Sequence, residues 1–124
     1  MNMVNLLAWA AAVALCAVFA DTAQAQDAAV GEHDFAKCAA CHPKDSTNSL
    51  GPGLSGIVGR HAGAVPGFHY SSAMKSSSIV WDAMSLDSFL ASPQKAVPGN
   101  VMPFSGIPDP KERADVIAYL ETLK

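Results

Sequence analysis

The clearest hydrophobic pattern lies near the C-terminus, where apolar side chains recur at positions i, i+3, i+4 and i+7 as Val116, Tyr119, Leu120 and Leu123. This spacing is typical of an amphipathic helix that buries one face. Just upstream, Asp109 is a good N-cap residue, Pro110 suits the first helical position, and Glu112 stands where a capping box places an acid. The pattern therefore predicts a C-terminal helix that begins after Asp109 and packs against a core.

A first helix is predicted over residues 27–40, with Gly31 and Phe35 on one face. Pro43 ends it, because proline lacks the backbone N–H and clashes with the preceding turn. The two ends of the domain are therefore both expected to be helical.

A short helix is predicted over residues 85–91, closed by Pro93. Its inward-facing side chains are expected to be Leu86, Phe89 and Leu90. Residues 43–78 and 94–107 hold many Gly, Pro and Ser residues without a sustained period, and they are predicted to be loops. No strand pattern competes, so the fold class is all-α. A loop as long as 43–78 is unusual inside a compact domain, and we expect it to wrap something other than protein.

The N-terminal segment is predicted to be a targeting signal. An apolar run over residues 6–20 is followed by Ala23-Gln24-Ala25, an A-x-A cleavage site. Residues 1–25 are therefore interpreted as a secretory signal peptide, which leaves a domain of residues 26–124 in the bacterial periplasm. The residues before the run include no Lys or Arg, so an uncleaved membrane anchor is the alternative, although the run is short for a span of about 20 residues.

Composition and charge narrow the function. The net charge is −3, and no basic cluster suggests binding to nucleic acid. Cys16 lies in the N-terminal segment, so Cys38 and Cys41 are the only cysteines of the predicted domain, and a disulfide framework is excluded. A domain of about 100 residues buries a small core and often needs an additional stabilising group.

The run Cys38-Ala39-Ala40-Cys41-His42 carries the most specific chemistry. C-x-x-C-H is the attachment site of a c-type haem, in which both thiols bond to the porphyrin and the histidine ligates the iron. Two thiols three positions apart lie about one helical turn apart, so both reach the same edge of the macrocycle. A redox disulfide or half of a zinc site is the alternative, but no second CxxC, no zinc-spaced Cys/His pair and no βαβ pattern accompanies the motif.

With this motif in place, the chain resembles the class I c-type cytochromes, the group of mitochondrial cytochrome c and bacterial cytochrome c2. The segments that carry the resemblance follow one another in the family's order: 31–35, 51–56, 59–60, 66–70, 79–81, 97–104 and 113–120. Together they span nearly all of residues 26–124. The resemblance implies the small class I cytochrome c fold, in which the N- and C-terminal helices pack crosswise and short helices and long loops wrap one covalent haem c.

The resemblance also implies the iron ligands. His42 would be the proximal ligand, and the carbonyl of Pro52 would accept the other ring N–H of His42, which fixes the tautomer. Met102 would be the distal ligand, and Met/His ligation raises the haem potential. Without the resemblance, Pro52 would be interpreted as a turn residue. A lone Met would be interpreted as a side chain that fills the core, and this interpretation suits Met74 and Met84.

The haem propionates need donors when they are buried. In the family an Arg, a Tyr and a Trp serve them, and Arg60, Tyr70 and Trp81 stand at the matching positions, although Trp81 would also suit the core. Asn100 stands where the family usually has Thr beside the Met ligand, and it can hydrogen-bond through an amide. Phe89 replaces a common Tyr, and the lost hydroxyl should alter the potential.

The function implied by the resemblance is that of a soluble periplasmic one-electron carrier. The protein is expected to be a monomer, and it is not expected to be an enzyme. Its partners would be redox proteins, an electron donor complex and a terminal acceptor, that dock at the exposed haem edge. Lys37 and Lys95 match the family's ring of lysines around that edge, but Gln94 and Val101 do not, so electrostatic steering toward an acidic partner should be weaker. The alternatives are an open-site haem protein, such as a peroxidase or gas sensor with Met102 unbound, and a membrane-anchored electron-transfer subunit.

Overall fold

The computed structural model describes residues 25–124. Its helices are α1 (Ala28–Asp34), α2 (Ala36–Ala39), α3 (Ser72–Lys75), α4 (Ala83–Ala91), α5 (Pro93–Ala96) and α6 (Pro110–Leu120). Within residues 25–124 the β pairing is a single bridge between His61 and Val80, so the predicted all-α class is confirmed. No helix in this range is long and apolar enough to cross a bilayer. The predicted signal peptide or anchor lies, except for residue 25, outside the described residues.

Helix α6 forms as its local sequence predicts. The Asp109 side chain accepts a hydrogen bond from the Lys111 backbone N–H at 2.9 Å, and Pro110 occupies the first turn. The helix ends at Leu120, so Leu123 of the apolar stripe lies beyond it and is half-buried. Glu112 pairs with the Lys37 ammonium of α2 rather than completing a capping box. The ion pair of Glu112 therefore links the N-terminal and C-terminal helices of the domain.

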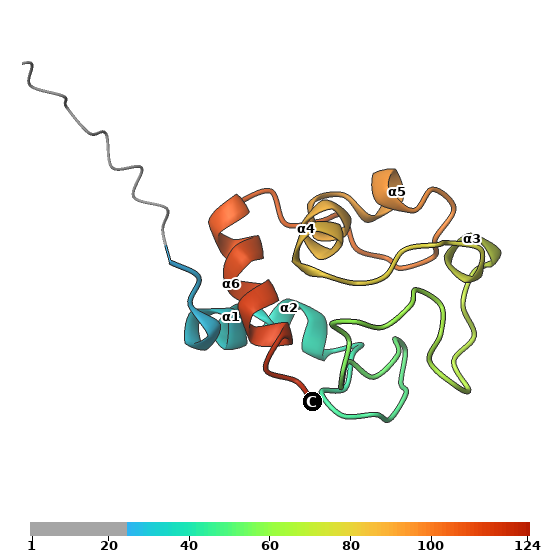
Figure 1. Cartoon of the computed structure of the whole chain (residues 1–124), viewed down its shortest axis with the longest axis horizontal. Helices are drawn as coiled ribbons and strands as arrows, with labels where there is room; N and C mark the ends of the chain where they lie inside the picture. Colours follow the sequence, from blue (N-terminus) through green and yellow to red (C-terminus); the bar gives the residue numbers. More distant parts are fainter. Residues whose placement is uncertain (1–24) are drawn as a thin grey trace, which may run out of the picture.

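Helices α1 and α6 cross at a steep angle (Figure 1). The crossing is close because Gly31 has no side chain, and an added Cβ would lie 1.9 Å from the Asp115 carbonyl oxygen. The buried Asp115 carboxylate accepts hydrogen bonds from the Lys111 ammonium at 2.6 Å and the Asp27 N–H at 2.8 Å. Both contacts, that with Lys111 above all, hold the pKa of Asp115 below its usual range. The Phe35 and Tyr119 rings pack beside the crossing at 5.2 Å.

We expect Gly31→Ala to destabilise the folded protein, because α1 would have to move away from α6. Overpacking of this kind costs about 1–3 kcal/mol, which lowers the melting temperature of a domain of this size by several degrees per kcal/mol. Thermal unfolding followed by circular dichroism checks this. The control is Val30→Ala at the adjacent position, where Val30 is 44% exposed. Equal melting temperatures for the two variants would contradict the tight crossing.

Several elements differ from the sequence-based expectations. The helix predicted over 27–40 is divided at Phe35, where a tighter turn forms because the Cys38 N–H donates to the Phe35 carbonyl at 2.8 Å. The predicted loops contain the single-turn helices α3 and α5. Helix α4 begins two residues earlier than predicted, because Asp82 and Ser85 form a capping box. Met84, expected in the core, is 82% exposed on its first turn.

The core lies where α4 and α6 meet, and the three predicted inward side chains of α4 are buried there, namely Leu86, Phe89 and Leu90. The long loop closes the other side of the molecule (Figure 1). It is fastened by backbone hydrogen bonds, from the Gly59 N–H to the Trp81 carbonyl at 2.7 Å and from the Trp81 N–H to the Arg60 carbonyl at 2.9 Å. The loop is thereby held over a space between itself and the helices.

Candidate functional site

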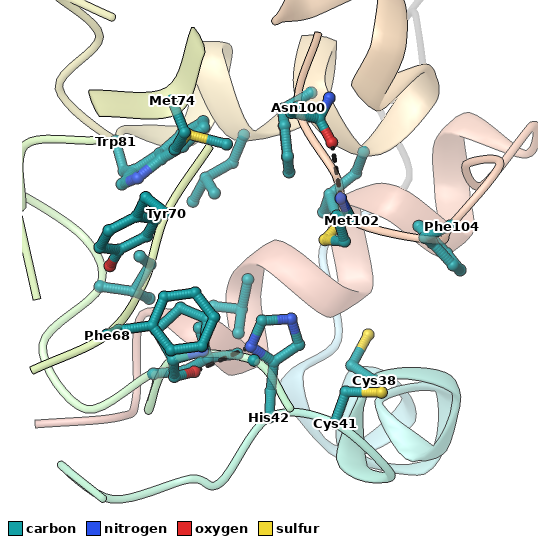
Figure 2. Close-up of a pocket in the computed structure, with 18 of the residues that line it drawn as sticks. Cys38, Cys41, His42, Phe68, Tyr70, Met74, Trp81, Asn100, Met102 and Phe104 are labelled. Carbon is teal, nitrogen blue, oxygen red and sulfur yellow. Dashed lines mark hydrogen bonds between the residues drawn. The ribbon is translucent and has the colours of Figure 1, made fainter. Parts of the chain in front are cut away.

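A pocket of about 410 Å³ lies between the helices and the long loop, and most of its lining is apolar. Figure 2 shows side chains from distant parts of the chain that point into it. The predicted site residues that line this pocket are Cys38, Cys41, His42, Pro52, Arg60, Tyr70, Trp81, Asn100 and Met102. The structure therefore gathers every site residue that the sequence singled out around one cavity.

The two cysteines lie together at one end of the pocket (Figure 2). The turn of α2 continues past its last residue, because the backbone N–H groups of Cys41 and His42 donate to the Cys38 carbonyl at 3.0 and 2.9 Å. Both thiols are free, and burial raises the pKa of the Cys38 thiol. Two thiols on one turn, directed at one apolar space, are arranged for attachment to the edge of a single flat ligand.

The orientation of the His42 ring is fixed from two sides. Its Nδ1 lies 2.8 Å from the carbonyl oxygen of Pro52, and because a carbonyl can only accept, Nδ1 carries the proton. In this tautomer of the neutral imidazole the unprotonated nitrogen is Nε2, which points into the pocket (Figure 2). The buried Gly51 packs against the ring, so that an added Cβ would lie 2.6 Å from Cε1. Sequence analysis gave Gly51 no role, although it stands in the Gly-Pro-Gly turn.

Met102 lies across the pocket from His42, with its sulfur toward the cavity (Figure 2). The side chain of Asn100 holds the backbone of the Met102 segment through hydrogen bonds. Its buried side-chain amide donates to the carbonyls of Pro93 at 2.8 Å and Val97 at 2.9 Å, and its Oδ1 accepts from the Met102 N–H at 3.0 Å. The amide that replaces the family's hydroxyl thus joins the end of α5 to the Met102 segment, a use that the sequence did not reveal.

The other end of the pocket holds the predicted propionate donors. Arg60 donates to the carbonyls of Gly53 and Ser55, and burial lowers the pKa of its guanidinium. The Tyr70 hydroxyl accepts from the Val65 N–H at 3.2 Å, which leaves its own proton free to donate, and burial raises its pKa. Trp81 is buried and packs on Phe89 with ring centroids 4.9 Å apart, so it serves the core as well as the pocket.

These residues fit a covalently bound haem. An apolar cavity suits a flat macrocycle, the two thiols meet one edge, and an unprotonated imidazole nitrogen and a thioether face each other across the space.

The sequence placed Met74 in the core, and it packs there but also lines the pocket. Within residues 25–124 no three Cys, His, Asp or Glu side chains gather as a metal site, so the zinc alternative finds no ligand set there.

Comparisons with known proteins identify the family of the chain. The family model described as cytochrome c matches residues 28–124. The cytochrome c2 of Rhodopila globiformis is 49% identical over 100 residues, which cover 79% of this chain and 94% of that protein. The cytochrome c-type cyt cy of Rhodobacter capsulatus is 49% identical over 98 residues, which cover 78% of this chain and 49% of that protein.

A solved structure, cytochrome cH from Methylobacterium extorquens, superposes with a TM-score of 0.75 at 49% identity and covers 77% of this chain and 98% of that one. The predicted class I cytochrome c fold is thereby confirmed. The chain belongs to the cytochrome c family and is an electron carrier, not an enzyme, with one covalent c-type haem attached at the Cys38 and Cys41 pair.

Proposed function

We propose that the protein is a periplasmic one-electron carrier in which His42 and Met102 are the axial ligands of the haem iron. The observation that carries this proposal is the hydrogen bond between Nδ1 of His42 and the Pro52 carbonyl, at 2.8 Å. It leaves Nε2 as a lone-pair donor directed at the cavity, opposite the Met102 sulfur. The haem supplies the one-electron redox chemistry when it is bound.

The protein groups on the two sides of the cavity make different contributions. The Pro52 carbonyl polarises the His42 ring and makes it a better electron donor. Met102 is a soft, neutral thioether, which favours the reduced state of an iron centre and so a higher potential. Two protein ligands leave no open position for a substrate. Little has to rearrange between the two oxidation states, and this suits rapid electron transfer.

Location in the periplasm is supported by the signal peptide that the sequence predicts over residues 1–25. The bacterial cytochrome c2 relatives are consistent with this. Sequencing the N-terminus of the native protein tests it. A mature chain that begins at Gln26 is expected, and a chain that retains residues 1–25 would support the anchored alternative instead.

The function is tested by a potentiometric titration of the purified holoprotein followed in the visible spectrum. A reversible titration with a one-electron slope and no turnover of peroxide is expected. Irreversible behaviour, or catalytic consumption of peroxide at rates typical of an enzyme, would contradict the carrier function.

We expect Asn100→Asp to loosen the Met102 segment, because a carboxylate cannot donate to the carbonyls of Pro93 and Val97. Each carbonyl keeps its backbone donor, so each lost side-chain hydrogen bond costs about 0.5–1.5 kcal/mol. The oxidised variant should therefore bind added cyanide faster than the wild type and melt at a lower temperature. The control is Gln94→Glu, at an exposed side chain that bonds the Asn100 carbonyl at 2.7 Å. If both variants bind cyanide at the wild-type rate, Asn100 does not position Met102.

A further inference from the structure

The pocket opens to solvent at a small set of side chains. The exposed residues among those that line it are Lys37, Leu50, Val101 and Pro103, and we call this set the pocket mouth. Leu50 is 80% exposed and Val101 is 73% exposed. Large apolar side chains this exposed, grouped around the opening of a cofactor site, are typical of a contact surface for another molecule.

The pocket mouth carries almost no net charge. Lys37 is its one charged member, and its ammonium is paired with the Glu112 carboxylate of α6. That carboxylate, through its hydrogen bond above all, raises the pKa of Lys37, so the ammonium remains charged at neutral pH. Lys95 on α5 is exposed but does not line the pocket. The mouth therefore offers no uncompensated positive charge to an acidic partner.

Both apolar side chains are presented from fixed backbone. Val101 lies between Asn100, which is held by the hydrogen bonds described above, and Met102, whose N–H is bonded to the Asn100 side chain at 3.0 Å. Leu50 precedes Gly51, whose N–H donates to the Cys41 carbonyl at 2.8 Å and whose carbonyl accepts from the Ser49 N–H at 2.9 Å. Side chains held in this way lose little backbone freedom when a partner binds, and this favours association through apolar contact.

From these observations we infer that the pocket mouth docks a redox protein whose own contact face is apolar and of low net charge. This inference rests on the proposed carrier function and specifies the chemistry of its partner. Association should be governed by short-range apolar contact rather than by long-range steering. Electron transfer through the mouth should therefore depend little on ionic strength, since salt screens only charged encounters.

Electron self-exchange between oxidised and reduced copies of the holoprotein provides a probe that needs no identified partner. Between low and high salt the wild-type rate should change by less than about twofold. Val101→Lys should slow self-exchange about fivefold at low salt, since two like charges in water at contact cost about 1 kcal/mol, and added salt should restore the rate. The paired variant Leu50→Ser with Val101→Ser should be slower at every salt concentration.

The matched control is Met84→Lys, which adds the same charge at an apolar residue that is 82% exposed and does not line the pocket. It should leave self-exchange within about twofold of the wild-type rate, because a charge outside the pocket mouth does not meet its counterpart at contact when two mouths face each other. A steep salt dependence in the wild type, or equal slowing by Val101→Lys and Met84→Lys, would overturn the inference while leaving the carrier function intact.

A second measurement does not depend on electron transfer. In the reduced protein, a cationic and an anionic nitroxide added to solution should relax the amide protons of Leu50 and Val101 to similar extents, because the local potential is near zero. If the anionic nitroxide relaxed these amide protons much more than the cationic one, the electrostatic potential at the pocket mouth would be positive. This result would overturn the inference. A protein that failed the potentiometric titration but relaxed equally with both nitroxides would contradict only the carrier function.

Discussion

Replacing Cys38 and Cys41 together with alanine is expected to leave a chain that does not fold. The reason is the pocket of about 410 Å³ that both side chains line. An empty apolar cavity costs about 24 cal/mol per Å³, so a space of this size would cost on the order of 10 kcal/mol. Single domains have a free energy of unfolding of only about 5–15 kcal/mol. The cost of the empty cavity is therefore as large as the total stability of the folded domain.

The long loop explains why the rest of the domain cannot compensate. Its described contacts are largely backbone hydrogen bonds and pocket-lining side chains, and few of its residues reach the core formed by α4 and α6. Without the haem the loop has little apolar surface to cover. The crossing of α1 and α6 would remain as a small contact, insufficient to order residues 43–78.

Far-ultraviolet circular dichroism of the double variant, purified without haem, checks this expectation. A weak signal with no cooperative melt is expected. The single variants Cys38→Ala and Cys41→Ala are the matched controls, since each retains one thioether bond and should keep the haem and a cooperative but lower melting temperature. A stable, cooperative melt of the haem-free double variant would contradict the account.

Met102→Ala is expected to lower the reduction potential and to open the iron to small ligands. Alanine has no donor atom, and the removed thioether leaves a space on the side of the cavity opposite His42. The potential should fall by a substantial part of the roughly 0.8 V range over which axial ligands set haem potentials. Potentiometry of the variant holoprotein, together with cyanide binding to its oxidised form, measures both effects.

Two other methionines are controls for this variant. Met74→Ala removes a thioether from the same pocket, and Met84→Ala removes one that is 82% exposed outside it. Both variants should keep a potential close to that of the wild type and a closed iron. An unchanged potential in Met102→Ala, or an equal fall in Met74→Ala, would mean that Met102 is not the ligand.

The elements that the sequence predicted correctly are those whose signals are local. Helix α6 has its N-cap at Asp109 and its apolar stripe within one short segment, so its start was predicted to the residue. The helices α3 and α5 have four residues each, too few to show a hydrophobic period, and were predicted as loop. Met84 was misplaced because residue type alone does not reveal which side of a helix faces the core.

In the site, too, the features with a local sequence signal were predicted and those without one were not. The fixed spacing of the C-x-x-C-H motif identified Cys38 and Cys41, and the family resemblance identified the contact of His42 with Pro52. Contacts between distant segments carry no local signal. The pairing of Lys37 with Glu112 across 75 positions, the steric contact of Gly51 with the His42 ring, and the three hydrogen bonds of the Asn100 amide became visible only in the folded chain.

Closure of the haem iron by His42 and Met102 can be measured in the visible spectrum of the purified protein reduced with dithionite, recorded before and after carbon monoxide is added. No change in the spectrum is expected, because both axial positions are held by the protein. A shifted Soret band would contradict this expectation, since carbon monoxide would then have reached an open or labile distal position, as in a peroxidase or a gas sensor.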